Sequence, residues 1–218
     1  MAVFDLDRLI PFGVNADGSP VAHDFESLGP LFVSGSHPSA RSSVVCTILN
    51  GARVRGHRAV YLGNWMSARN VSLLAENGVQ ASSQLLTIAD LAERTLKELS
   101  KRREQFALSG WSSYWDAPVG ERPNLIVFAV DTWSNIASKQ HSTDPTTQRE
   151  NGFRSRATEA SIELFRHGAE YGIYSIIVRD TDGEGAPTLK LYERHRALYH
   201  DGLGPTVDME LWERDAFA

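Results

Sequence analysis

Short apolar segments alternate along the chain with longer segments in which apolar residues recur at helical spacing. The segments that predict buried strands are residues 30–33, 58–62, 85–88, 124–131 and 172–178. The segment 124–131 is apolar almost without interruption, which predicts a strand that is buried on both faces. Strands that alternate with helices predict a mostly parallel sheet, so the expected fold class is α/β.

Three helices are predicted between these strands. They span residues 42–50, 87–110 and 154–171. Serine hydroxyls begin the first helix, and Thr87 followed by Asp90 three residues later predicts a capped start for the second. The apolar stripe of the second helix ends at Gly110, a residue type that commonly terminates helices. Residues 139–151 are polar and predict a mobile loop before the third helix.

The length of the chain, 218 residues, fits a single domain, because domains of roughly 100–200 residues are the usual unit. Asp17 and Gly18 stand between two short runs, which predicts the turn of a small β-hairpin. The predicted organisation is therefore one domain, 1–218, in three parts. These parts are an N-terminal β-ribbon at 1–28, an α/β core at 29–192 and an acidic C-terminal tail at 193–218.

The composition predicts a globular protein without a strong attraction for nucleic acid. Hydrophobic residues make up 42% of the chain and charged residues 22%, which excludes disordered, collagen-like and coiled-coil chains. The net charge is -5, whereas a free-standing nucleic-acid-binding domain usually carries a basic surplus that neutralises phosphates. DNA remains a possible partner, but the charge does not favour it.

The sequence also predicts a soluble, cytoplasmic protein. Its first residues are acidic where an export signal is basic, and no run of eighteen apolar residues occurs that would span a membrane. The single cysteine, Cys46, excludes an internal disulfide and fits a reducing compartment. We expect Cys46 to be a core residue.

The segment after the first predicted core strand resembles a phosphate-binding loop with two positions changed. Such loops have the pattern G-x-x-x-x-G-K-[S/T], and their backbone amides surround the phosphates. Residues 35–42 keep the first glycine, the spacing and the final hydroxyl of Ser42. Ala40 replaces the second glycine, and Arg41 replaces the lysine. On these residues alone, the segment is either a degenerate phosphate loop or a Ser/Pro-rich turn.

Further segments resemble the motor domain of FtsK/SpoIIIE-type ATPases, and they occur in the order of that family. Residues 14–43 are similar to its entry hairpin, strand and phosphate loop, and 91–114 to its long helix and the turn that follows. Residues 124–131 resemble its Walker B strand, and 165–178 its sensor strand. The EccC ATPase domains of type VII secretion are similar too. The resemblance implies a three-layer, RecA-like P-loop NTPase fold with a mostly parallel sheet.

The resemblance also implies a site for ATP and Mg²⁺. The residues that match its nucleotide-binding positions are Gly35, Ser36, His37, Ser39, Ala40, Arg41, Ser42 and Ser43. Ser42 and Asp131 match the two positions that hold the metal. We expect ATP and Mg²⁺ to bind weakly or not at all, because several other positions differ from those of an intact site.

The differences affect the groups that such a site uses for hydrolysis. The planar fork of Arg41 is longer than a lysine ammonium and points its donors differently. Ala40 adds a Cβ where backbone approaches phosphate, and Pro38 removes an N–H donor. Thr132 replaces the glutamate that follows the Walker B aspartate, and a hydroxyl is no general base at neutral pH. The sequence therefore predicts no confident catalytic residue.

Other residues allow a functional and a structural interpretation. Lys101, Arg102 and Arg103 form a basic run that could contact DNA phosphates or face solvent. Arg154 and Arg156 could act on a neighbouring subunit's nucleotide or form surface ion pairs. Trp111, Tyr114 and Trp115 could anchor a partner or pack against the long helix; the seven histidines show no metal-ligand spacing.

The expected function is that of a degenerate FtsK/SpoIIIE-like ATPase domain. It would bind nucleotide weakly or not hydrolyse it, and it would act as an assembly or partner-binding module of a DNA- or protein-translocation machine. The partners would be related ATPase subunits, in a homo- or hetero-oligomer, or another protein. The alternative is an active ATP-dependent translocase, and a third hypothesis is a cleft that binds a ligand other than a nucleotide.

Overall fold

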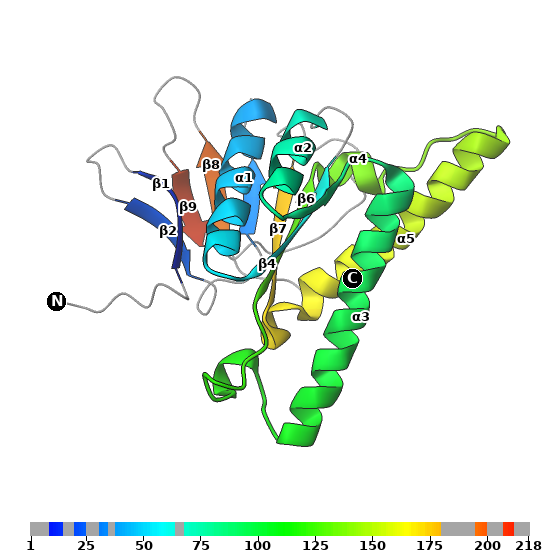
Figure 1. Cartoon of the computed structure of the whole chain (residues 1–218). Helices are drawn as coiled ribbons and strands as arrows, with labels where there is room; N and C mark the ends of the chain where they lie inside the picture. The colour runs from blue at the N-terminus through cyan, green and yellow to red at the C-terminus, as the bar shows by residue number, and fades with distance from the viewer. Residues whose placement is uncertain are drawn as a thin grey trace.

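The structure is a computed structural model that describes residues 9–14, 20–24, 31–34, 38–63, 68–179, 195–199 and 207–211 (Figure 1). Its strands are β1 (Leu9–Val14), β2 (Pro20–Asp24), β3 (Leu31–Ser34), β4 (Arg58–Gly63), β5 (Gln80–Ser82), β6 (Ile126–Asp131), β7 (Ile173–Arg179), β8 (His195–Tyr199) and β9 (Val207–Leu211). Its helices are α1 (Pro38–Val54), α2 (Ala68–Glu76), α3 (Leu85–Ser109), α4 (Trp133–Ala137) and α5 (Pro145–His167). Two 3₁₀ turns, η2 (Tyr114–Asp116) and η3 (Ala169–Tyr171), complete the described elements.

Most of the strands form one sheet in the order β5-β4-β6-β7-β3-β8-β9. Every neighbouring pair in this sheet is parallel except β8 and β9. The strands β1 and β2 form a separate antiparallel pair. The expected α/β class, parallel sheet and N-terminal hairpin are confirmed. The predicted turn at Asp17 and Gly18 lies outside the described residues.

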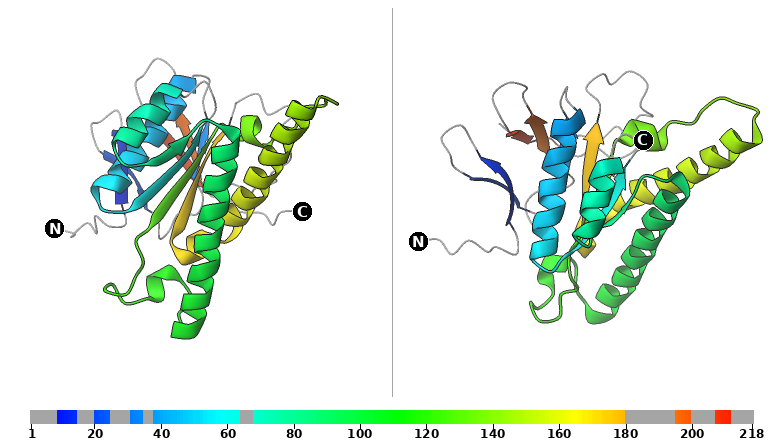
Figure 2. Two further views of the ribbon diagram at one scale, coloured as in Figure 1. Left: turned by 45° about the vertical axis from the view of Figure 1, so that its right-hand side comes forward. Right: turned by 45° about the horizontal axis from the view of Figure 1, so that its top comes forward.

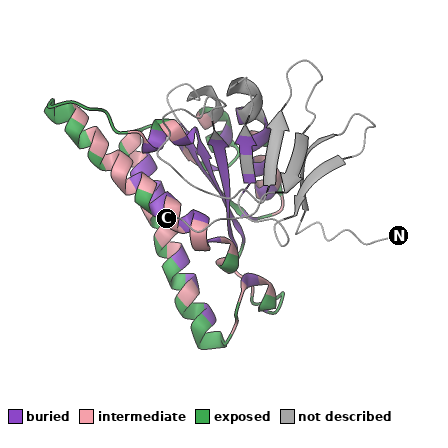
Figure 3. Ribbon diagram, turned by 180° about the vertical axis from the view of Figure 1, so that it is seen from behind, coloured by how far each residue is buried: buried purple, intermediate pink, exposed green. Residues whose placement is uncertain are grey.

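Helices cover the sheet on both sides and give the fold three layers. Figure 2 shows α1 and α2 on one face of the sheet, and α3 with α5 on the other. Two clusters of buried apolar side chains correspond to these interfaces. All six residues of β6 are buried, as the apolar run predicted, and Figure 3 shows buried residues concentrated in the central strands.

The long helix α3 begins earlier than its sequence predicted. It starts at Leu85, after Gln84, and the expected strand over residues 85–88 is wrong because those residues form its first turn. The preceding strand is β5, which pairs with β4. The predicted stop is confirmed, since Gly110 adopts a left-handed φ of 71° at the C-cap.

The helix α5 also begins earlier than predicted, at Pro145 instead of residue 154. Asp144 caps it, because the Thr147 amide donates to Asp144 Oδ2 at 2.9 Å, and proline suits the first helical position. The predicted mobile loop is therefore wrong for residues 145–151. At the other end the helix stops at His167, and residues 169–171 form η3.

The helices α2 and α4 and the strands β5, β8 and β9 were not predicted from the sequence. The helix α2 lies between β4 and β5, and β8 and β9 lie in the segment predicted to be an acidic tail. These two strands extend the sheet at the edge of β3, so this segment contributes to the fold. The division of the chain into one domain with three parts stays a prediction.

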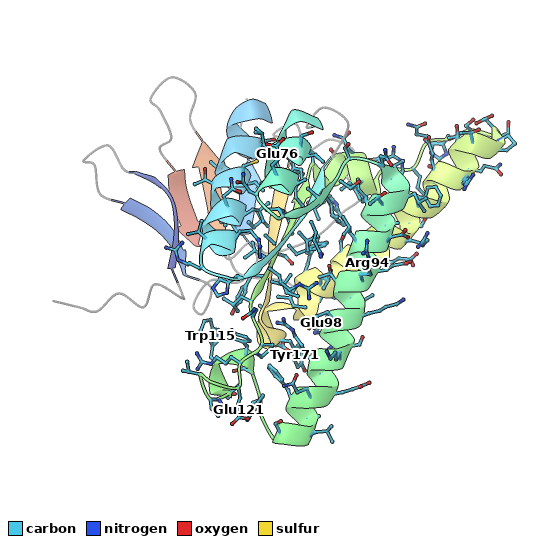
Figure 4. All side chains as sticks on the ribbon, in the orientation of Figure 1. Glu76, Arg94, Glu98, Trp115, Glu121 and Tyr171 are labelled. Atoms are coloured by element: carbon cyan, nitrogen blue, oxygen red, sulfur yellow. The ribbon has the colours of Figure 1, made fainter. Side chains whose placement is uncertain are left out.

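Arg102 joins the C-terminal half of α3 to the N-terminal ends of β6 and β7. It is only 2% exposed, and its guanidinium donates to the carbonyls of Asn124, Tyr171 and Gly172 at 2.6–3.1 Å. Its Nε donates to Glu98 Oε1 at 3.3 Å, and Figure 4 labels Glu98 and Tyr171 in this region. Neither a solvated nor a DNA-facing role fits Arg102.

The aromatic segment after α3 packs against the domain. Tyr114 is buried, and Trp111 meets Phe106 edge-on with ring centroids 5.4 Å apart. Trp115 donates from Nε1 to the Tyr174 hydroxyl at 2.8 Å. These contacts support the packing interpretation of the aromatic residues.

Candidate functional site

The hydroxyl of Ser42 and the carboxylate of Asp131 meet at the carboxyl end of the sheet. Ser42 Oγ donates to Asp131 Oδ2 at 2.6 Å, although the two residues are 89 positions apart in the chain. Both are buried, with exposed fractions of 7% and 4%. The structure thus brings together the two residues that the sequence suggested as a metal-binding pair; their metal role stays a prediction.

The fold explains why these two side chains meet. Asp131 is the last residue of β6, and alternate residues of a strand share a face, so it lies on the same face as Val127 and Ala129. Those two residues pack in the core beneath α1. Ser42 lies in the second turn of α1, which follows β3, and only β7 stands between β3 and β6.

Two further hydroxyls bind the same carboxylate. The Tyr61 hydroxyl donates to Asp131 Oδ2 at 2.5 Å, and Thr132 Oγ1 donates to Oδ1 at 3.3 Å. Tyr61 is fully buried on β4 and Thr132 is 4% exposed. Sequence analysis did not identify Tyr61 as a site residue, because a tyrosine in an apolar strand has the pattern of a core residue.

The candidate phosphate loop is shorter than its sequence pattern suggests. Gly35, Ser36 and His37 lie outside the described residues, and α1 begins at Pro38, so five of the eight residues 35–42 are helical. The first turn of a helix leaves its amides without helical partners, and proline has no amide to offer. Ser39 and Ala40 thus supply the first available amides, while Arg41 and Ser43 follow within the same helix.

The donor set of the Ser42–Asp131 pair fits a magnesium ion. Mg²⁺ prefers oxygen ligands and usually enters protein sites through one or two carboxylates, with waters and substrate phosphates completing its shell. A serine hydroxyl beside a buried carboxylate offers this chemistry. Among the described residues, no group of three or more His, Cys, Asp or Glu side chains forms an alternative metal site.

A cavity of about 470 Å³ lies at the same end of the sheet, over the opposite face. Its lining comes from β4, α3, α4 and α5, and it includes Ser134, Asn135, Glu150 and Arg154. Arg154 donates from its terminal nitrogen to the Asn135 carbonyl, which connects α5 to the helix that directly follows Asp131 and Thr132. Arg154 therefore stabilises the position of α4.

Arg156 forms ion pairs within the domain. Its guanidinium contacts Glu93 at 2.7 Å and Asp90 at 2.9 Å, so it links α5 to α3. The hydrogen bonds from Arg156 lower the pKa of Glu93. The surface ion pair that the sequence left open for Arg156 is thus what the structure shows.

Solved structures of ATPase domains have the same architecture as this chain. The conjugation coupling protein TcpA of pCW3, in monomer form with ATPγS, aligns with a TM-score of 0.72 and 18% identity, over 88% of this chain and 54% of TcpA. EssC ATPases 2 and 3 from Geobacillus thermodenitrificans align with a TM-score of 0.61 and 15% identity, over 88% of this chain and 36% of the EssC chain. Thermomonospora curvata EccC ATPases 2 and 3, in complex with a signal sequence peptide, align with a TM-score of 0.55 and 19% identity. This alignment covers 82% of this chain and 30% of the EccC chain.

These similarities define the fold as that of a P-loop ATPase domain. The resemblance to FtsK/SpoIIIE-like ATPase domains expected from the sequence is confirmed at the level of the fold. The chain spans about half or less of the length of the structures compared here. No family model and no curated protein sequence matches it. Among its described residues, no helix is long and apolar enough to cross a membrane.

Proposed function

We propose that this chain is a degenerate ATPase domain that binds nucleotide weakly and does not hydrolyse it. It serves as an assembly or partner-binding module of a DNA- or protein-translocation machine. The observation that carries this proposal is the Ser42–Asp131 hydrogen bond with Thr132 directly after it. Ser42 and Asp131, the two residues proposed for the metal site, are retained, while residue 132 is a threonine and not a glutamate.

The absence of a carboxylate at residue 132 supports the loss of hydrolysis. A general base contributes roughly 10²–10⁴ to a rate, and the Thr132 hydroxyl is instead a donor to Asp131. The early start of α1 supports weak binding, because Pro38 removes one amide from the helix N-terminus that would face phosphate. Both differences lower the affinity for the transition state.

The similar proteins support the nucleotide and the partners of the proposal. TcpA is described with ATPγS, and EccC with a signal sequence peptide. The proposed ligand is accordingly ATP with Mg²⁺. The proposed partners are related ATPase subunits, and either DNA or a polypeptide is the translocated substrate.

Titration with a fluorescent ATP analogue tests the proposal. We expect saturation at high micromolar to millimolar analogue with only a small effect of Mg²⁺, and a weaker signal for Ser42→Ala. Ser113→Ala is the matched control, because Ser113 Oγ also donates to an aspartate, Asp116, at 3.0 Å, but this hydrogen bond is exposed to solvent. Absence of saturation in the unmodified chain would contradict the proposal and favour a ligand other than a nucleotide.

Phosphate release from ATP distinguishes the proposal from an active translocase. We expect no release above background from the concentrated protein, with or without DNA. Robust turnover that Asp131→Asn abolishes would show that Arg41 and Thr132 support catalysis, and the active alternative would replace the proposal.

A further inference from the structure

Tyr61 reaches the candidate metal site from a neighbouring strand. The register of the parallel pair places Tyr61 opposite Ala129 and Gly63 opposite Asp131. Tyr61 therefore lies two residues before the end of β4, on the face that also carries Asp131. From there its hydroxyl extends to Asp131 Oδ2 at 2.5 Å.

The two hydroxyl donors saturate one oxygen of the carboxylate. A carboxylate oxygen has two lone pairs, and Oδ2 accepts one hydrogen bond from Ser42 and one from Tyr61. Both distances are in the range of strong, charge-assisted O–H···O⁻ bonds. The longer bond from Thr132 reaches Oδ1, and the carboxylate is almost fully shielded from solvent.

We propose that Tyr61 is a positioning residue that competes with hydrated Mg²⁺ for Asp131 and so makes nucleotide binding nearly independent of the metal. This inference rests on the proposed function. A water molecule held by Mg²⁺ beside Ser42 needs a free lone pair on Asp131 Oδ2, and Tyr61 takes the one that the Ser42 bond leaves. Because the Tyr61 ring is fixed in the core, its hydroxyl holds this position without losing further side-chain freedom.

If Tyr61 had only a structural role, Tyr61→Phe would affect the response to Mg²⁺ differently. If the hydroxyl only satisfies a buried polar group, Tyr61→Phe changes the stability of the fold and leaves the effect of Mg²⁺ on nucleotide affinity unchanged. If the hydroxyl instead prepares Asp131 for the metal, the same change weakens the Mg²⁺ effect. Only competition makes the effect of Mg²⁺ larger.

The experiment compares Tyr61→Phe with the unmodified chain and with Tyr174→Phe. Tyr174 is a matched control, because it is a buried tyrosine of β7 whose hydroxyl pairs with Trp115, and it lies near the start of β7, away from Asp131. The affinity for the fluorescent ATP analogue is measured with Mg²⁺ and with a chelator. Thermal unfolding of each variant confirms that it is folded.

We expect the Mg²⁺-dependent gain in affinity to be about tenfold larger in Tyr61→Phe than in the other two proteins, since one charge-assisted hydrogen bond is released. An unchanged or smaller Mg²⁺ effect in Tyr61→Phe overturns the inference.

Direct binding of Mn²⁺, followed by electron paramagnetic resonance without nucleotide, separates this inference from the proposed function. If no protein binds the analogue, the proposed function fails. In that case tighter Mn²⁺ binding by Tyr61→Phe than by the unmodified chain still supports competition at Asp131. Equal or weaker binding contradicts it.

Discussion

Cys46 lies on α1, one turn beyond Ser42, and it is partly buried. Burial, and to a smaller extent the negative charge of Asp131, raise the pKa of its thiol from 9.0 to about 11. The thiolate is the reactive form of cysteine, so the folded chain holds Cys46 in its unreactive form at neutral pH. The thiol also reports on the charge of the candidate site.

Alkylation of Cys46 should therefore be slow in the folded protein. At pH 8 a thiol with this pKa is about a hundredfold less ionised than in the unfolded chain, and the alkylation rate should fall by a similar factor. Asp131→Asn removes a charge that opposes the thiolate, so it should lower the pKa and accelerate the reaction. Equal rates in folded and urea-unfolded protein would contradict the expected pKa.

The same shift gives the fold a dependence on pH. Because the unfolded thiol ionises at lower pH than the folded one, the unfolded chain binds fewer protons between pH 9.0 and about 11. The contribution of Cys46 is complete below this window, and the free energy of unfolding falls as the pH rises through it.

The sequence predicted individual site residues where a pattern constrained them. Ser42 was identified because it follows a strand at the spacing of a known motif, and Asp131 because it ends a strongly apolar strand; the two lie in contact. Tyr61 and Arg102 were not identified. Tyr61 contacts Asp131 on the neighbouring strand, and Arg102 contacts carbonyls near the starts of β6 and β7. No spacing along the sequence indicates these long-range contacts.

Arg102 fixes how α3 meets the sheet, so Arg102→Ala should destabilise the fold strongly. The change leaves three backbone carbonyls without their buried donor, and we expect a loss of about 3–5 kcal/mol in the free energy of unfolding. Urea unfolding measures it. Lys101→Ala is the control, since Lys101 is exposed and neighbouring, and should change stability by less than about 0.5 kcal/mol. Equal stability of the two variants would contradict this role.

The boundaries of the elements were predicted less well than their existence. Residues 85–88 are apolar and short, a pattern shared by a buried strand and the first turn of a helix, and tertiary packing places them in α3. The polar first half of α5 has few apolar residues to mark it, yet Asp144 and Pro145 start the helix there. At α5 the capping residues are thus a better signal than periodicity, whereas the capped start predicted at Thr87 is wrong, because α3 begins at Leu85 after Gln84.

At the scale of the whole molecule, the alternation of strands and helices was predicted because apolar runs alternate with longer amphipathic segments along the chain. The place of each strand in the sheet was not predicted, since hydrophobic pattern alone does not choose between neighbours. The additional strands β8 and β9 were missed because polar and acidic residues surround them in a segment with little apolar pattern.

The overall charge predicts weak binding to DNA. With a net charge of -5 and Arg102 buried, the chain lacks the basic surplus that neutralises phosphates. Fluorescence anisotropy with a duplex should give a dissociation constant weaker than about 100 μM at physiological salt. The double variant Lys101→Ala, Arg103→Ala should bind no differently. Submicromolar binding that falls steeply with salt would contradict this expectation and favour DNA as the translocated substrate.

The central position of β3 affects how the chain acquires its structure during synthesis. Both strands that flank β3, namely β7 and β8, come from the last third of the chain. Leu31 therefore cannot pair with Ile176 until that residue has been synthesised. At about 5–20 residues per second, this interval lasts roughly 7–30 seconds on the ribosome. Throughout that time the apolar strand β3 has no neighbouring strand to pair with. Molecular chaperones that protect nascent chains should therefore bind the first third of this protein preferentially.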